Sequence, residues 1–123
     1  MDAKIKLLPN KETASIENIK YFQILIGSLL YLALASRPDI IYAVIKLARY
    51  ASNPSSDHII AIKRVFRYLK YSIFLGIIYL NNNNYYLQGY CDADYAGDII
   101  SSKSTTGYIF YYAGGPIMWK SKL

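Results

Sequence analysis

Three carboxylates lie close together in the last third of the chain, on a segment that otherwise has the character of a buried strand. Asp92, Asp94 and Asp98 fall within the stretch GYCDADYAGD. Because strand side chains alternate, Asp92 and Asp94 are expected on one face. Two negative charges at that spacing repel, and one carboxyl would be driven to protonate unless a cation lies nearby. Hard oxygen ligands suit Mg²⁺ or Mn²⁺, so the spacing admits metal-assisted hydrolysis of phosphodiesters.

The same carboxylates also have a purely structural interpretation. Asp is common where a strand ends and a turn begins, so Asp94 and Asp98 could serve only to form that turn. The pattern Asp-x-Asp-x-x-x-Asp is short and occurs in many proteins. Spacing alone therefore leaves both interpretations open.

The composition describes a basic chain that can fold. Its 123 residues make at most one ordinary domain, or pieces of two. A hydrophobic fraction of 54% and an aromatic fraction of 15% exclude a disordered chain. The net charge of +6 favours polyanionic partners such as nucleic acid, although a small basic domain can also simply be soluble. Cys91, the single cysteine, leaves no internal disulfide, fits a reducing compartment and is interpreted as a small strand residue.

The first half of the chain is expected to be helical. Residues 1–18 lack apolar periodicity and are interpreted as a flexible lead-in. From Tyr21 onward apolar residues recur at three- and four-residue steps, which predicts a helix that ends before Arg37-Pro38. The apolar run Tyr21–Ala35 is shorter than the ~20 residues of a membrane span. A core helix and no membrane partner are therefore expected.

Two further helices are expected over about Asp39–Tyr50 and Asp57–Tyr71. The turn Ser52-Asn53-Pro54-Ser55 separates them, and Ser55 or Ser56 can cap the second. His58 is interpreted as an exposed residue of its first turn, with a ligand role as the alternative.

The polar side of the helix over Asp57–Tyr71 is strongly basic. It carries Lys63, Arg64, Arg67 and Lys70, with tyrosines beside them. Such a face could contact a nucleic-acid backbone, and the alternative is an ordinary solvated face. Binding of this kind must fall steeply with salt, because it depends on the release of counterions.

After Ser72 the pattern changes to one typical of strands. The segment Phe74–Leu80 is β-rich, a hairpin turn is expected at Ala113-Gly114-Gly115, and the remaining connections are polar. The strands are expected over Tyr85–Tyr95, Thr105–Tyr112 and Pro116–Lys120. The fold class is therefore predicted to be α+β, with the helices first and a β meander after them.

Five segments of the sequence, in this order, closely resemble the Pol polyprotein of copia-type long-terminal-repeat retrotransposons. They are YFQILIGSLLYLALASRPDIIYAV, ASNPSSDHIIAIKRVFRYLK, GYCDADYAGD, STTGYIF and GGPIMWKSK. In that family the region joins the end of reverse transcriptase to the start of ribonuclease H. The resemblance implies that residues 19–72 are a thumb- or connection-like helical region. It also implies that residues 73–123 are the first strands of an incomplete ribonuclease H-like mixed sheet.

The resemblance also assigns roles to the carboxylates. Asp92 matches the family's first catalytic aspartate, which would bridge the Mg²⁺ or Mn²⁺ ions that activate water and stabilise the leaving oxygen. Asp94 is the second candidate for a metal ligand. The family's next ligand, a glutamate on a later helix, and its Tyr-x-Asp-Asp polymerase strand are absent from this sequence. The isolated chain is therefore expected to be a truncated, pseudogene-like copy that is prone to aggregate, binds no metal stably and is not an enzyme.

Partners and location follow from the same resemblance. In the parent polymerase the basic helix face would lie along an RNA–DNA hybrid, so weak, salt-sensitive binding of nucleic acid is expected here. The alternative function is a small non-catalytic interaction protein that binds nucleic acid or related Pol polyproteins. The expected location is the cytoplasm or nucleus. The C-terminal Ser-Lys-Leu matches a peroxisomal address, but the family has a Ser-Lys pair after its tryptophan, so the match is attributed to where the reading frame ends.

Overall fold

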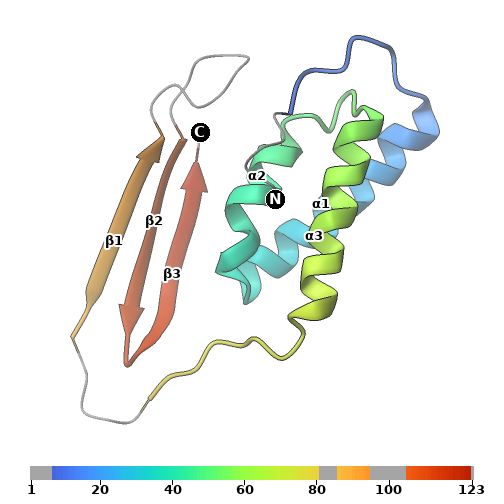
Figure 1. The fold of residues 1–123 in the computed structure, drawn as a ribbon. Coiled ribbons are helices and arrows are strands. Elements are labelled where there is room, and N and C mark those ends of the chain that lie inside the picture. The colour runs from blue at the N-terminus through green and yellow to red at the C-terminus, as the bar shows by residue number, and fades with distance from the viewer. Residues whose placement is uncertain (1–6, 81–85, 95–104, 123) are drawn as a thin grey trace.

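The fold is α+β, as the sequence predicts. The computed structural model describes residues 7–80, 86–94 and 105–122, without the side chains of Ala93, Asp94 and Thr105. Within these residues, three α-helices and a short 3-10 helix precede a three-stranded antiparallel sheet. Figure 1 shows the helices on one side and the sheet on the other, with an extended segment that leads from α3 towards β1. Several predictions fall outside the described residues: the start of the lead-in, the loop Asn81–Asn84, the connection around Asp98 and the terminal Leu123.

Helix α1 spans Ile16–Ala35 and begins earlier than the apolar pattern indicated. Ser15 caps it, since its hydroxyl accepts a hydrogen bond from the Asn18 backbone N–H, so the last residues of the expected lead-in are helical. By length and composition α1 could cross a membrane. In the structure one stripe of it packs against the other helices, while several of its other apolar side chains are exposed. The buried residues of that stripe are Phe22, Ile26, Leu29 and Ala33.

The two other helices follow a proline break. A 3-10 turn at Pro38–Ile40 leads into α2, Ile41–Ala48, and α3 spans Ser56–Tyr71. Proline suits the first turn of a helix because its missing N–H would have no partner there. Helix α2 ends sooner than expected because the chain continues from Ala48 as hydrogen-bonded turns. Its buried residues, with those of α3, complete the core: Ile41, Val44, Leu47, Ile62 and Val65.

His58 is buried, so its interpretation as an exposed first-turn residue was wrong. Its Nδ1 accepts a hydrogen bond from the Ser55 backbone N–H (2.9 Å), while the Ser55 hydroxyl accepts one from the His58 N–H. This reciprocal pair is a capping box with histidine in place of the usual Glu or Gln. The imidazole stacks on Tyr50 with ring centroids 4.0 Å apart, and Nε2 lies 2.8 Å from the Leu8 carbonyl oxygen. Because Nδ1 accepts, Nε2 carries the proton and donates to Leu8.

The segment before α1 packs against the turn between α2 and α3. Leu7 is buried, and its carbonyl accepts a hydrogen bond from the Tyr50 hydroxyl. Asn53 accepts from the Ala14 N–H (2.8 Å) and donates to the Glu12 carbonyl (2.9 Å). An extended segment without apolar periodicity is thus held by side chains about forty positions along the chain.

The sheet is a meander in the order β1-β2-β3, with β1 at Gln88–Asp94, β2 at Thr105–Tyr112 and β3 at Gly115–Lys122. The expected hairpin is present: Ala113 and Gly114 both have positive φ, as a two-residue hairpin loop requires. The β-rich segment 74–80 forms no strand. It meets the hairpin through one backbone bond, from the Leu80 N–H to the Ala113 carbonyl.

Trp119 joins the sheet to the helices. Its indole Nε1 donates a hydrogen bond to the Ala33 carbonyl of α1 at 2.8 Å, and its ring packs against the buried core. Ile109 of β2 and Tyr90 of β1 lie in register with Trp119. Because partners in antiparallel register share a face, the face that carries Trp119 is the one turned towards the helices.

Candidate functional site

Asp92 lies on the helix-facing side of the sheet. It is in register with Gly107 of β2, which in turn is in register with Ser121 of β3. This row is two residues along from the row that contains Trp119, so both rows point to the same side. Asp92 is exposed, and the opposing Gly107 leaves the space beside the carboxylate without a side chain.

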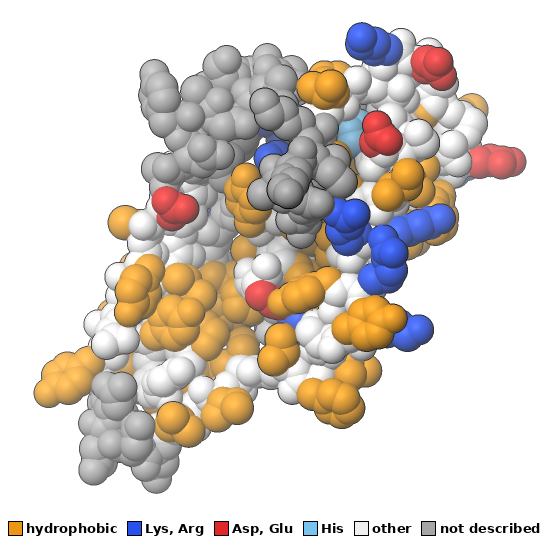
Figure 2. Space-filling model, in the orientation of Figure 1, with side chains coloured by type: hydrophobic (Ala, Val, Ile, Leu, Met, Phe, Trp, Pro, Cys, Tyr) orange, Lys and Arg blue, Asp and Glu red, His pale blue; other side chains and the backbone are white. Residues whose placement is uncertain are grey.

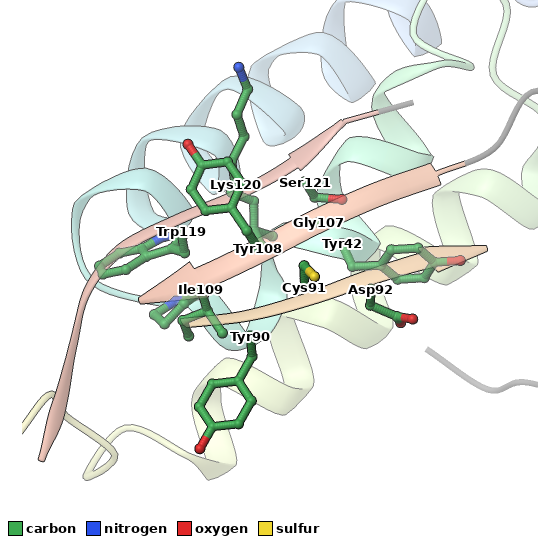
Figure 3. Close-up of a pocket in the computed structure, with 12 residues that line it drawn as sticks. Tyr42, Tyr90, Cys91, Asp92, Gly107, Tyr108, Ile109, Trp119, Lys120 and Ser121 are labelled. Carbon is green, nitrogen blue, oxygen red and sulfur yellow. The ribbon is translucent and has the colours of Figure 1, made fainter. Parts of the chain in front are cut away.

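A cleft of about 340 Å³ separates this part of the sheet from the start of α2. Pro38, Ile41 and Tyr42 form its helical wall, and residues of all three strands, Asp92 and Trp119 among them, form the other. Figure 3 shows these side chains around the cleft. Most of the lining is apolar or aromatic, with Asp92 and Lys120 as its charged residues.

The described residues do not provide a complete site for a divalent cation. No group of three or more His, Cys, Asp or Glu side chains comes together anywhere in them. Asp92 is placed, but the Asp94 side chain and the whole of Asp98 lie outside the described part. Mg²⁺ usually keeps several waters and takes one or two carboxylates from protein, so Asp92 alone supplies at most part of such a site. The pairing of Asp92 with Asp94 on one metal therefore stays a prediction.

The basic residues predicted on α3 do share the outer part of that helix. Lys63, Arg67 and Lys70 are exposed and Arg64 is half-buried. Figure 2 shows Lys and Arg side chains gathered over α3, with hydrophobic side chains among them. Asp57 in the first turn is the only acidic residue of α3. The structure thus brings the four cations onto one helix and leaves their contact with nucleic acid a prediction.

Sequence reasoning missed a polar cluster that ties the ends of α1 and α3 together. Arg37, 9% exposed, donates to both carboxylate oxygens of Asp39 (3.0 and 2.8 Å) and to the carbonyl and hydroxyl of Ser72 (3.2 and 2.8 Å). The Tyr68 hydroxyl donates to Asp39 at 2.6 Å. The Arg37 hydrogen bonds hold the pKa of Asp39 below its usual value against the opposing effect of burial. Only the local triplet Arg37-Pro38-Asp39 was visible in the sequence, and it was interpreted as a helix break.

Burial also acts on the capping histidine. It lowers the pKa of His58, while the Leu8 carbonyl and the Asp57 charge act in the opposite direction. The neutral imidazole that results is the form needed to accept the Ser55 N–H. Its role is structural, because both ring nitrogens are occupied by hydrogen bonds within the fold.

Comparison with known proteins finds relatives of two kinds. The chain is 43% identical to a retrovirus-related Pol polyprotein from transposon TNT 1-94 of Nicotiana tabacum over 98 residues, and 47% identical to that from transposon RE2 of Arabidopsis thaliana over 98 residues. Each match covers 80% of this chain and 7% of the polyprotein. The chain is also 40% identical over 107 residues to secreted RxLR effector protein 161 of Plasmopara viticola, across 87% of this chain and 75% of that protein.

Two other comparisons found nothing. No protein-family model matches the chain, and no solved structure matches it. The relationship therefore rests on sequence similarity to whole proteins. The chain spans most of one relative and a small part of the two polyproteins.

Proposed function

We propose that this chain, whose homologues include retrovirus-related Pol polyproteins of transposons, is a copia-type, retrotransposon-derived Pol segment. In the proposal residues 1–18 are a lead-in, residues 19–72 correspond to the thumb or connection of reverse transcriptase, and residues 73–123 correspond to the first strands of ribonuclease H. The parent protein would copy RNA into DNA and cleave the RNA strand of the hybrid. The segment itself is proposed to be inactive when it stands alone.

One observation carries the proposal. A 98-residue match within a chain of 123 residues must include residues 26–98 wherever it begins. The similarity to Pol polyproteins therefore runs through α2 and α3 and reaches β1 with Asp92. An antiparallel meander with an aspartate on its first strand is compatible with the start of a ribonuclease H sheet. The similarity is thus a continuous segment that joins the helices to the sheet, and not a shared motif.

Inactivity is tested by a cleavage assay on the purified chain. A labelled RNA–DNA hybrid is incubated with Mg²⁺ or Mn²⁺, and Asp92→Asn serves as the matched control. We expect the same background for both proteins, because Asp92 alone does not hold two metal ions in a fixed geometry. Metal-dependent cleavage by the unsubstituted chain that the Asp92→Asn variant lacks would show that the segment is an enzyme.

The proposed partner is nucleic acid, bound weakly through Lys63, Arg64, Arg67 and Lys70 of α3. Fluorescence anisotropy with an RNA–DNA hybrid should show affinity that falls steeply between 50 and 200 mM salt, by about tenfold or more if only a few phosphates are neutralised. Replacing Arg67 by Glu should weaken binding further, whereas Lys122→Glu, at an exposed lysine of β3, should change it little. Affinity that does not depend on salt would contradict this contact.

A second candidate function is a non-catalytic interaction protein. It is favoured by the P. viticola relative, of which this chain covers 75% and whose name describes a secreted effector and not a polymerase. The two candidates differ in what they need: a Pol segment acts only within a longer product, whereas an interaction protein binds a partner as it stands. A cytoplasmic or nuclear location is proposed for either, and a fluorescent fusion that keeps Leu123 at its end tests it against peroxisomal import.

A further inference from the structure

A groove runs between α1 and α3 on the helical part of the molecule. Its volume is about 620 Å³, and it is lined by Tyr21 and Leu25 of α1 and by Ile60, Lys63, Phe66 and Arg67 of α3. Four of these six side chains are apolar or aromatic, and the remaining two are cations. None of these residues belongs to the Asp92 cleft or to the Arg37 cluster.

The apolar side chains of the groove are partly open to solvent. Tyr21 is 45% exposed and Ile60 is 55% exposed, and Leu25 and Phe66 lie half-buried below them. Contiguous exposed apolar surface bordered by polar residues marks interaction sites on soluble proteins. The groove therefore has a hydrophobic floor that a partner could cover.

The two cations stand on successive turns of α3 at the edge of that floor. Lys63 and Arg67 are four residues apart and both exposed, so they lie one above the other on the helix surface. Asp57, nearly three turns before Arg67, is the only acidic residue of α3, and Glu17 is the only one of α1. The rim of the groove along α3 is thus positively charged.

We propose that this groove binds an acidic amphipathic helix of another protein, with its apolar side chains on the floor and its carboxylates paired with Lys63 and Arg67. Helix-in-groove recognition uses apolar anchors at positions i, i+3 or i+4, and i+7. The stretch of α3 from Ile60 to Arg67 is about 10 Å long at 1.5 Å per residue, which matches about two turns of a partner helix, the span from i to i+7.

A second copy of this chain does not have the required chemistry. Its net charge is +6, and no described helix carries more than one acidic residue in its first turn or an acidic face elsewhere. Two cationic grooves would repel each other. A nucleic acid, in turn, could use the cations but would leave four apolar side chains uncovered. The acidic amphipathic helix is the occupant that satisfies both parts of the groove.

The test uses a fluorescein-labelled helical peptide with Leu or Phe at i, i+3, i+4 and i+7 and Glu on both flanks, and a scrambled peptide of the same composition. The patterned peptide should bind about tenfold more tightly than the scrambled one, because only it presents a continuous apolar stripe. Ile60→Gln should weaken its binding about fivefold or more, while Leu34→Gln, at an exposed position of α1 nine residues beyond Leu25, should not. Both substitutions are at exposed positions, so thermal unfolding should stay the same.

An oligonucleotide separates this proposal from the proposed function. Ile60→Gln keeps the charge of α3 and should leave oligonucleotide affinity unchanged, whereas Lys63→Glu should weaken both ligands. Equal binding of the patterned and scrambled peptides, or no loss of peptide affinity with Ile60→Gln, would contradict the proposal of a peptide groove. The proposal of nucleic-acid binding would not be affected. If Ile60→Gln weakened only the oligonucleotide, the groove would belong to nucleic acid.

Discussion

At the scale of single residues, His58 shows how one side chain can hold three segments together. It caps α3, stacks on Tyr50 in the turn after α2 and bonds to the segment before α1. The sequence around it suggested only a polar first turn, since the partners Tyr50 and Leu8 lie 8 and 50 positions away. A local pattern contains no information about such contacts, which is why the prediction of an exposed histidine was wrong.

The buried His58 should make stability depend on pH. Its pKa in the folded chain is below the unfolded value of 6.5, so the unfolded chain binds a proton first as the pH falls. Stability should therefore be full above about pH 6.5 and decrease below it, as protonation removes the acceptor for the Ser55 N–H. Thermal unfolding between pH 7.5 and 5 measures this decrease. His58→Gln, which can still cap but does not titrate, should flatten the dependence over that range.

Arg37 is the second single residue that should contribute strongly to stability, although it lies in a turn. Arg37→Ala removes four hydrogen bonds and leaves Asp39 without its cation, so we expect a loss of about 2 kcal/mol in the free energy of unfolding. Tyr68→Phe removes only one bond to Asp39 and should cost about 1 kcal/mol.

Chemical denaturation of the three proteins provides the measurement. The pKa of Asp39 is lowered in the fold, so its contribution is present above its ordinary value of 3.8 and lost as the pH falls below it. The difference in the free energy of unfolding between the wild-type chain and Arg37→Ala should become smaller in that acidic range. A difference that stays constant would mean that the Asp39 ion pair is not its source.

At the scale of elements, apolar periodicity predicted the helices and the strand-like pattern predicted β2. The start of α1 and the absence of a strand at 74–80 depend on contacts that such patterns do not encode. Thr105–Tyr112 was predicted with its observed limits. Helix α1 gained its first turn from the Ser15 cap, and the β-rich 74–80 segment found no strand partner beyond Leu80. That Asp92 would face the helices could not be predicted, because the side of the sheet is decided by Trp119, a residue of another strand.

Two glycines test the backbone conformations of the β2–β3 hairpin and of α1. Gly114 closes the β2–β3 hairpin with φ +80°, so Gly114→Ala should destabilise the chain by about 1 kcal/mol. Gly27 lies inside α1 with open space around it, so Gly27→Ala should stabilise by about 1 kcal/mol through helix propensity. Equilibrium unfolding of both variants decides the matter, and equal effects of the same sign would contradict the assigned conformations.

At the scale of the whole molecule, the described helices leave one side of the sheet uncovered. Phe110 and Met118 are in register, with Tyr108 and Tyr112 on the same side of β2, and Met118 is 52% exposed. The helices cover only the opposite side, where Trp119 makes its bond to Ala33. An exposed apolar sheet face favours association, and so does an edge strand such as β1, which pairs only with β2 among the described residues.

Self-association should therefore respond to a single surface change. Met118→Lys places a charge in the middle of the open face without entering the core, and it should raise the concentration at which the chain associates. The melting temperature should stay within a few degrees, since the residue is already half exposed. Light scattering over a concentration series, with the exposed Ile24→Lys on α1 as control, distinguishes the sheet face from apolar surface in general.

The segment after α3 has a further consequence, for limited proteolysis. Phe74 is 97% exposed and lies where the chain has neither helix nor strand, so it offers chymotrypsin an accessible aromatic cleavage point. A cut there would separate the helices from the strands while the indole of Trp119 still reached Ala33. If the two fragments then elute together from a sizing column, their union does not need the peptide link. If they part, the covalent tether itself keeps the two halves in contact.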